Sequence, residues 1–297
     1  MKILNIRWSL VIVILALIII IIFEINKWPV GGSVAAVVLG YFLPGIINWI
    51  HDIFDPVNWK VSQRRLEHAG LIVDNTILRI SFAYLYRIKV GNKYLLVKNA
   101  RGTGKYQPVG GVYKLLGNEK LELKNRYQVK DDDKISIDKS SRDDYRLRIE
   151  NKYLVDFIRR FDCDADREQI YNLSREFKEE LVDKGILNWN EITYRFCGRH
   201  MTEIYYDNYF KCYELLLADI VELLPTIEQE LDLERLASEK NDAYCFVTAD
   251  EIFSLGINTD KCELKEFIAD HSMKMVQETE GQLMRLDDVG KKYTVNL

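Results

Sequence analysis

The sequence predicts an α+β fold for most of the chain, preceded by two apolar segments that are long enough to cross a membrane. Three observations support this prediction. Over residues 76–297, strand-like runs and helical patterns follow one another without the regular alternation of a parallel α/β fold. Residues 1–52 are predominantly apolar, although the whole chain is 48% hydrophobic and 29% charged. Residues 53–75 are a polar linker between these parts.

The two apolar segments, about residues 8–25 and 29–50, can each span a bilayer as a helix, which needs about 20 residues. Only a few polar residues around Lys27 separate them, so we expect a tight hairpin of two transmembrane helices. Basic residues flank the pair at Lys2, Arg7, Lys60, Arg64 and Arg65. The positive-inside rule then predicts a multi-pass membrane protein with both termini in the cytoplasm. A cleaved signal peptide is the alternative, but no small-residue cleavage site follows the first segment.

Small residues recur every fourth position in the second segment, at Gly32, Ala36 and Gly40. This spacing places them on one helix face, where another helix can approach closely. They are a candidate helix-packing surface for a homo-oligomer in the lipid bilayer. Since Gly and Ala are common in membrane helices, the pattern also has a purely compositional explanation.

Net charge and cysteine content exclude other classes of function. The formal charge of −4 argues against a protein that binds a DNA or RNA polymer over its whole surface. The five cysteines are odd in number and widely spaced, without a CxxC pair, so neither a disulfide framework nor a zinc site is expected.

Residues 76–297 are predicted to form one cytoplasmic domain. A short helix over 59–70 in the linker precedes it, and a hairpin follows at 77–99, with its turn at Gly91. A loop at 100–114 contains four glycines, and a charged insertion at 117–165 is expected to run over the surface. Further elements are expected as a helix over 166–184, strands over 192–198, 204–218 and 243–248, and helices over 227–238 and after 248.

Three carboxylates, Glu176, Glu179 and Glu180, lie close together on the helix predicted at 166–184. Clustered carboxylate oxygens suit a hard cation such as Mg²⁺, which makes these residues candidate metal ligands. Arg175 is positioned to pair with Glu179 one turn later. The alternative is an ordinary solvent-facing helix with ion pairs along its surface.

The motif REFKEEL at 175–181 resembles the core of the Nudix box. YLLVKNARGTGKYQPVGG resembles the strand, basic loop and Pro-Gly-Gly segment that precede the box, and FVTADEIFSLG resembles a late Nudix strand and helix. The resemblance covers roughly residues 77–256. It implies a Nudix α/β/α sandwich in which Glu176, Glu179 and Glu180 match the family's Mg²⁺-binding positions for cleavage of nucleoside-diphosphate-linked substrates.

Other parts of the box depart from the family pattern. Phe161 and Arg167 stand where the family has a glycine and a glutamate, and Glu168 is one place out of register. The Gly110-Gly111 pair is separated from Arg175 by 63 residues, and Val182 replaces another expected glycine. The departures favour a nucleotide-shaped cleft that no longer hydrolyses its ligand, so no catalytic residue is assigned.

The combination of a two-span hairpin with a degenerate Nudix domain looks like the membrane-anchored, SMODS-associated Nudix proteins of bacterial cyclic-oligonucleotide anti-phage signalling (CBASS). This resemblance implies an effector whose Nudix-like domain senses a cyclic di- or trinucleotide, oligomerises and drives the hairpins to disrupt the inner membrane, causing abortive infection. Cationic, aromatic and amide groups suit such a ligand. The candidate ligand-binding residues beside the glycine loop are Arg101, Lys105, Tyr106 and Gln107.

Two other classes of function remain open. One is a membrane-tethered, Mg²⁺-dependent Nudix hydrolase, in which Glu176, Glu179 and Glu180 act in catalysis. The other is a membrane interaction or scaffold protein with a vestigial Nudix fold.

Overall fold

The computed structural model describes residues 59–99, 102–132, 141–163, 165–258 and 263–297, together with Ile14, Ile18, Ile21 and Ile25. These four isoleucines are helical and exposed. The chain divides into two compact units, Met1–Arg65 and Leu66–Leu297. All the strands described below belong to the second unit.

The structure does not support the predicted multi-pass location in the inner membrane. Across the described residues, no helix combines the length and the apolar character that a membrane span requires. The predicted spans at 8–25 and 29–50 lie outside the described residues, apart from the four isoleucines, and so do Gly32, Ala36 and Gly40.

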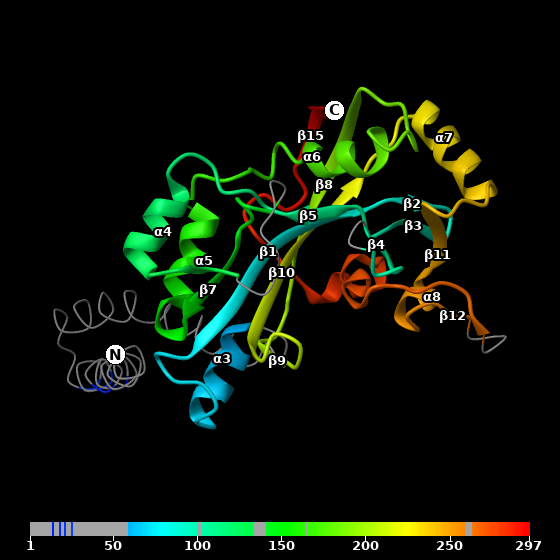
Figure 1. Cartoon of the computed structure of the whole chain (residues 1–297). Helices are drawn as coiled ribbons and strands as arrows, with labels where there is room; N and C mark the ends of the chain where they lie inside the picture. The colour runs from blue at the N-terminus through cyan, green and yellow to red at the C-terminus, as the bar shows by residue number, and fades with distance from the viewer. Residues whose placement is uncertain are drawn as a thin grey trace. The chain divides into compact units, whose positions relative to one another are not determined.

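The largest sheet among the described residues has nine strands and is mixed. Its strand order is β14-β8-β10-β1-β7-β6, with β15 on β8, β5 on β1 and β9 on β10. The two long central strands, β1 (Ile77–Arg87) and β10 (Cys212–Leu223), run parallel to each other (Figure 1). The others are β5 (Gly110–Val112), β6 (Lys130–Asp131), β7 (Arg146–Glu150), β8 (Glu191–His200), β9 (Tyr205–Asp207), β14 (Leu283–Met284) and β15 (Lys292–Asn296).

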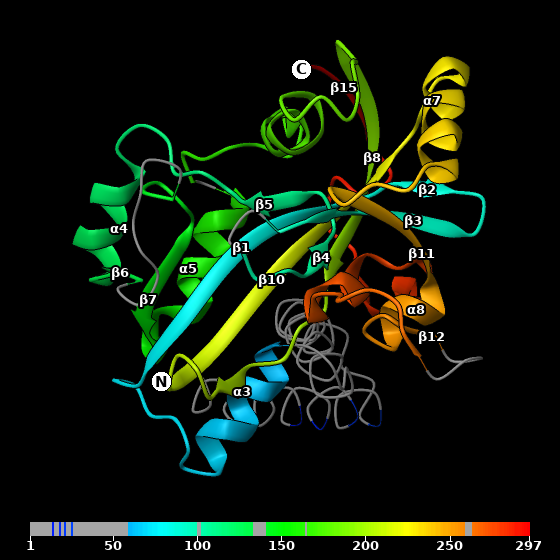
Figure 2. The same ribbon diagram turned by 45° about the vertical axis from the view of Figure 1, so that its right-hand side comes forward.

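A smaller sheet lies beside one end of the large one (Figure 2). It is formed by β2 (Lys89–Val90), β3 (Lys93–Lys98), β4 (Tyr106–Gln107) and β11 (Tyr244–Thr248). A short ladder of β12 (Ile257–Asn258) and β13 (Glu263–Leu264) comes later in the chain. Buried residues of both sheets, among them Leu85, Leu96 and Val247, form a core between them.

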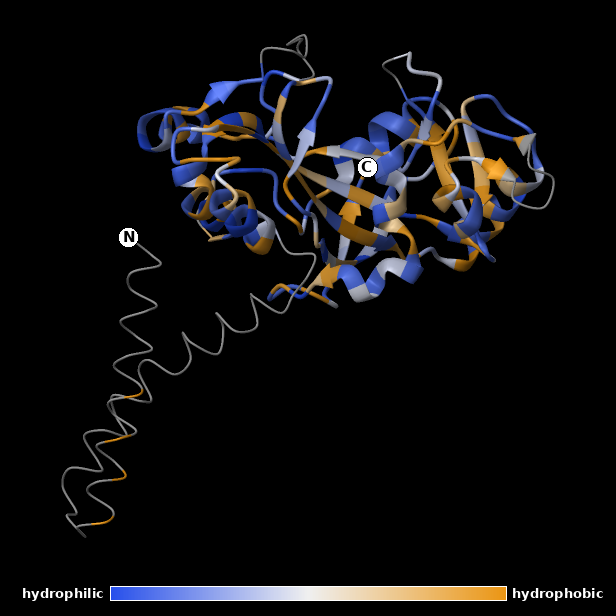
Figure 3. Cartoon of the chain, turned by 90° about the horizontal axis from the view of Figure 1, so that it is seen from below, coloured by the Kyte–Doolittle hydropathy of each residue, from blue (hydrophilic) through white to orange (hydrophobic). Residues whose placement is uncertain are grey.

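The helices in the described residues are short. The α-helices are α3 (Trp59–His68), α4 (Glu119–Tyr127), α5 (Leu154–Cys163), α6 (Ser174–Phe177), α7 (Ile227–Ser238) and α8 (Ala249–Phe253). The 3₁₀ turns are η1 (Asn151–Tyr153), η3 (Asp270–Met275) and η4 (Gln277–Gln282), and η2 (Lys178–Val182) is a π-helical turn. Apolar residues gather along the central strands, whereas the helices around them mix polar and apolar residues (Figure 3).

The two faces of the large sheet differ in what covers them. Alternate residues of a strand point to opposite faces. Phe82 stacks on Phe161 of α5 at 3.7 Å between ring centroids, which defines the α5 face. Arg87 points to the other side and donates to the carbonyl of Met275 in η3 at 2.7 Å, which defines the η3 face.

Most predicted elements are confirmed. The helices at 59–68 and 227–238, the strand at 191–200 and the strand-helix pair at 244–253 lie where the sequence placed them. The hairpin turn at Gly91 is also present, but it joins β2 to β3, and β1 belongs to the other sheet. The run at 204–218 is a hairpin of β9 and β10 instead of one strand.

The charged insertion at 117–165 is not a surface excursion, which corrects the prediction. Its strand β7 pairs with the first half of β1, from Ile77 to Ser81, and β5 pairs with the second half. Its helix α5 buries Phe157 and Phe161 against the sheet. The high charge density misled the prediction because the outer faces of β7 and α5 carry the charges while their inner faces are apolar.

Candidate functional site

The three glutamates lie on a short helical segment formed by α6 and η2, residues 174–182, which we call the glutamate helix. It begins at Ser174, so the predicted helix over 166–184 is wrong in its first half. The Asp183 N–H donates to the Lys178 carbonyl at 2.8 Å, five residues back, which is the bond that makes η2 a π turn. Gly185, with φ +70°, follows in the left-handed conformation expected after a helix end.

Residues 165–173 are not helical, because buried tyrosines bind their backbone. The Tyr86 hydroxyl donates to the Leu173 carbonyl at 2.7 Å. The Tyr194 hydroxyl donates to the Ile170 carbonyl at 2.9 Å and accepts from the Leu173 N–H at 3.0 Å. These bonds satisfy backbone groups that a helix would otherwise satisfy internally, so tertiary contacts override the local helical pattern.

The glycine pair and the glutamate helix are in direct contact, although the insertion separates them in the sequence. The Glu180 carboxylate accepts a hydrogen bond from the Gly110 N–H at 3.0 Å. A Cβ added at Gly111 would lie 1.9 Å from Glu176 Oε1, so only glycine leaves room for this carboxylate. Gly110 has φ +146°, and a Cβ there would lie 2.2 Å from the Tyr84 carbonyl oxygen.

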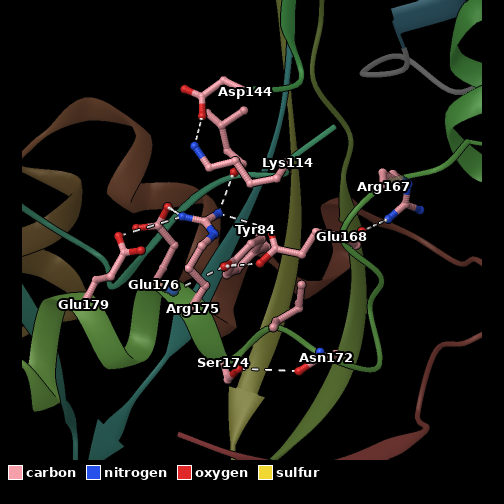
Figure 4. Close-up of polar contacts among 12 residues, drawn as sticks. Tyr84, Lys114, Asp144, Arg167, Glu168, Asn172, Ser174, Arg175, Glu176 and Glu179 are labelled. Atoms are coloured by element: carbon pink, nitrogen blue, oxygen red, sulfur yellow. Dashed lines mark hydrogen bonds and ion pairs between the residues drawn. The ribbon is translucent and has the colours of Figure 1, made fainter. Parts of the chain in front are cut away.

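Arg175 connects the carboxylates of the site (Figure 4). Its guanidinium pairs with Glu176, with Glu168 at 3.0 Å and, more distantly, with Glu179 at 3.9 Å. It also donates to the Val112 carbonyl of β5 at 2.9 Å. Glu168 therefore contacts Arg175 despite its shift in the sequence, since the non-helical segment before the glutamate helix turns at residues 169–172.

Tyr84 of β1 contacts both Glu168 and the glutamate helix. Its hydroxyl donates to Glu168 at 3.4 Å and accepts from the Glu176 N–H at 3.5 Å, both long bonds. The side chain is fully buried, and burial together with the negative charge of Glu168 raises the pKa of the hydroxyl well above its ordinary value. The hydroxyl thus stays protonated at neutral pH.

The electrostatic state of the glutamates differs from that of three free carboxylates. Burial raises the pKa of Glu180 to about 7, while the Gly110 N–H and the Gln107 side chain oppose the rise. The pKa of Glu179 is also raised, first by partial burial and then by Glu176. With Arg175 as a counter-ion, the cluster carries much less negative charge near pH 7 than its composition indicates.

As arranged, these residues do not fit a magnesium ion. No group of three or more His, Cys, Asp or Glu side chains converges on a metal position in the part of the chain that the structure describes. Glu176 is engaged by Arg175, Glu180 is turned toward Gly110, and the Glu179 side chain is 53% exposed. Magnesium binding by Glu176, Glu179 and Glu180 therefore stays a prediction, and no chemical step is derived from it.

The predicted ligand-binding residues have different environments. Arg101 lies outside the described residues. Lys105 is 45% exposed and pairs loosely with Asp270 at 3.5 Å. Tyr106 is buried in the core between the sheets, and its hydroxyl donates to the Asp242 carbonyl, so its ring is not exposed for stacking. Gln107 accepts from the Asn99 amide at 2.5 Å and lies beside Glu180.

The sequence did not identify the tyrosines that hold the site. Tyr84 and Tyr86 alternate with Leu85 in a strand that is buried on both faces. Buried tyrosine hydroxyls need hydrogen-bond partners, so this run was the signal that a polar segment would dock on the strand.

A search against protein-family models finds that residues 77–276 match a model described as SMODS-associated NUDIX domain. No curated protein and no solved structure matches the chain.

Proposed function

Because the chain belongs to the SMODS-associated NUDIX domain family, we propose that it is an effector of a CBASS anti-phage system whose Nudix-like domain binds a cyclic di- or trinucleotide. Binding would promote association between copies of the chain, and this association would be the signal that arrests the infected cell. The membrane step predicted from the sequence is not part of this proposal.

The observation that carries the proposal is the extent of the family match. It spans residues 77–276, which is 200 of the 297 residues, and includes the glycine pair, the insertion and the glutamate helix. The insertion is therefore part of the family domain.

The charge state of the site lessens its repulsion of a phosphodiester. Three ionised carboxylates would repel a nucleotide, but Arg175 neutralises part of the cluster and the raised pKa of Glu180 removes more of its charge. Lys105 and Gln107 lie on the chain segment just before Gly110, and Lys105 is exposed. We infer that these two residues, with Arg101, contact the ligand.

A thermal-shift screen of the full-length protein against cyclic di- and trinucleotides tests the proposal. We expect one of them to raise the melting temperature and to increase the oligomer size measured by mass photometry. Lys105→Gln should weaken binding, whereas the matched control Lys292→Gln, an exposed lysine on β15, should not. The proposal fails if no cyclic nucleotide changes the melting temperature or the assembly state.

A second candidate is a Mg²⁺-dependent hydrolase of a nucleoside-diphosphate-linked substrate. It is favoured by one observation, the direct contact of Glu176 and Glu180 with the Gly110-Gly111 pair. Hydrolysis would require the carboxylates to turn away from their present partners toward a metal. Mg²⁺-dependent phosphate release that is lost in Glu179→Gln and Glu180→Gln, with no change in oligomer size, would support this candidate over the first.

A further inference from the structure

Lys274 in η3 has an unusual environment for a charged side chain. Its ammonium donates to the Leu216 carbonyl of β10 at 2.8 Å and to the Thr202 hydroxyl at 3.4 Å. Both partners are neutral. Among residues 59–297 as far as the structure describes them, no carboxylate forms an ion pair with Lys274, although a largely desolvated charge is costly without one.

The carboxylate of Glu214 attracts the Lys274 ammonium but already has other partners. Glu214 favours the charged form of Lys274, but its own carboxylate pairs with Arg79 at 2.9 Å and accepts from the Tyr205 hydroxyl at 2.9 Å. Burial outweighs this attraction and lowers the pKa of Lys274 to about 8, so the ammonium is still mostly charged at pH 7. An anion bound next to the Lys274 ammonium would offset the free energy lost when this charge is removed from water.

Three polar side chains extend from Lys274 toward the surface. Thr202 Oγ1 lies 3.2 Å from His200 Nδ1, and His200 Nε2 lies 3.3 Å from Gln282 Oε1. If the threonine donates to Nδ1 and Nε2–H donates to the glutamine, every group in this line is satisfied. The Gln282 NH₂ group and the third N–H of Lys274 then remain as donors, and Gln282 is exposed.

Two further observations fit a site for an anion. Burial, with the charge of Lys274, lowers the pKa of His200 to about 4, so the imidazole is neutral at pH 7 and Lys274 carries the positive charge of this line. The Ser272 hydroxyl, two residues before Lys274, is fully buried and lacks a hydrogen-bond partner within the described residues. A buried hydroxyl in this state is uncommon and needs an acceptor or donor.

We propose that the Lys274 ammonium and the Gln282 amide, positioned by Thr202 and His200, bind a phosphate group, free or as an ester. The site lies on the η3 face of the large sheet, whereas the glutamate helix packs on the α5 face through Phe177 and Tyr86 (Figure 1). It is therefore separate from the site around Arg175. A lysine ammonium and an amide NH₂ group can donate to several oxygens, of which a phosphate has more than a carboxylate.

The test is phosphate binding by the full-length protein, followed as the rise in melting temperature over a chloride solution of equal ionic strength. Phosphate should stabilise the wild type and Lys292→Gln, and acetate should not. In Lys274→Gln, the Kd for phosphate should rise at least about tenfold, because the only charged donor is removed. A parallel titration with AMP distinguishes a phosphate ester from free phosphate as the ligand.

Thr202→Val provides a second variant that keeps the lysine, in case Lys274→Gln does not fold. It should also weaken phosphate binding, since the Thr202 hydroxyl accepts from the Lys274 ammonium and links it to His200, and valine removes this support. An equal response to phosphate in the wild type, Lys274→Gln and Thr202→Val would refute the site, as would no response in the wild type. The result does not depend on the proposed cyclic-nucleotide sensing, because inorganic phosphate is the probe.

Discussion

Gly110 and Gly111 are neighbours in the sequence but restrict the site in different ways. At Gly110 the obstacle to a side chain is the backbone of β1, and φ is +146°, which L residues rarely adopt. At Gly111 the obstacle is the end of a single side chain, Glu176. A side chain at Gly110 would therefore disturb the packing of the sheet, whereas a side chain at Gly111 would displace only the Glu176 carboxylate.

Alanine substitutions should separate these two constraints. We expect Gly110→Ala to lower the free energy of unfolding by about 3 kcal/mol and Gly111→Ala by about 1 kcal/mol, since a side chain can move more easily than a strand. Urea denaturation measures both values. In a Glu176→Ala background the cost of Gly111→Ala should disappear while that of Gly110→Ala persists, and an unchanged Gly111→Ala cost would contradict the contact.

His200 should make the stability of the protein depend on pH. Its pKa is about 4 in the folded state, lowered mainly by burial, against an ordinary value of 6.5. The unfolded chain therefore binds the proton first, and the stabilisation present above pH 6.5 is lost as the pH falls toward 4. Allowing for partial exposure, we expect a loss of about 2 kcal/mol.

Comparison with His200→Gln isolates this contribution from that of the other acidic groups. The difference in the free energy of unfolding between wild type and variant, measured in urea at pH 7.5 and pH 4.5, should change by the same amount of about 2 kcal/mol, in favour of the variant at low pH. A difference that is constant with pH would show that the imidazole is protonated equally in both states.

The sequence predicted which residues lie at the site better than it predicted which side chains they contact. Glu176, Glu179 and Glu180 were identified from their spacing, and all three lie at the site around Arg175. Glu168 appeared to be out of register because its position was counted against the spacing of the family motif. The chain before Ser174 is not helical, and spacing in an irregular segment does not predict which side chains meet.

The glutamate helix shows how packing determines the length of an element. Ile170, Leu173, Phe177 and Leu181 have helical spacing, and all four are buried. Only the last two are in helical segments, because Tyr86 and Tyr194 bind the backbone of the first two. The apolar spacing indicated which residues are buried, but it could not distinguish a helix from an irregular segment whose backbone is bound by tyrosine hydroxyls.

Removing these hydroxyls should loosen the segment before the glutamate helix. Tyr194→Phe removes two backbone bonds and should cost about 2 kcal/mol, whereas Tyr86→Phe removes one and should cost about 1 kcal/mol. Hydrogen exchange should increase in residues 165–176 of both variants. Faster exchange spread evenly over the domain would instead indicate a general loss of stability.

The insertion is an integral part of the large sheet. Phe161 of α5 is 1% exposed, stacks on Phe82 and lies 3.8 Å, ring centroid to Cζ, from the Arg167 guanidinium. We expect Phe161→Ala to cost about 3–5 kcal/mol, the usual cost of removing a buried aromatic ring. Leu121→Ala on α4, where the side chain is 57% exposed, is the control and should change stability very little.

For the whole molecule, composition and local pattern were sufficient to predict an α+β domain, and the family match over 77–276 confirms the resemblance to SMODS-associated Nudix proteins. The predicted inner-membrane location is not supported by the described residues. Strand order could not be predicted, because β1 pairs with the distant β10 and β7 through contacts that no local pattern encodes.

The proposed function requires the domain to recognise a cyclic oligonucleotide without consuming it. The decisive experiment is equilibrium dialysis of the full-length protein against radiolabelled cyclic di- and trinucleotides, with Mg²⁺ present and chromatography of the recovered label. We expect saturable retention of at least one ring-closed nucleotide, recovered intact. Absence of retention for all of them, or recovery only of cleaved products, would refute the proposed function.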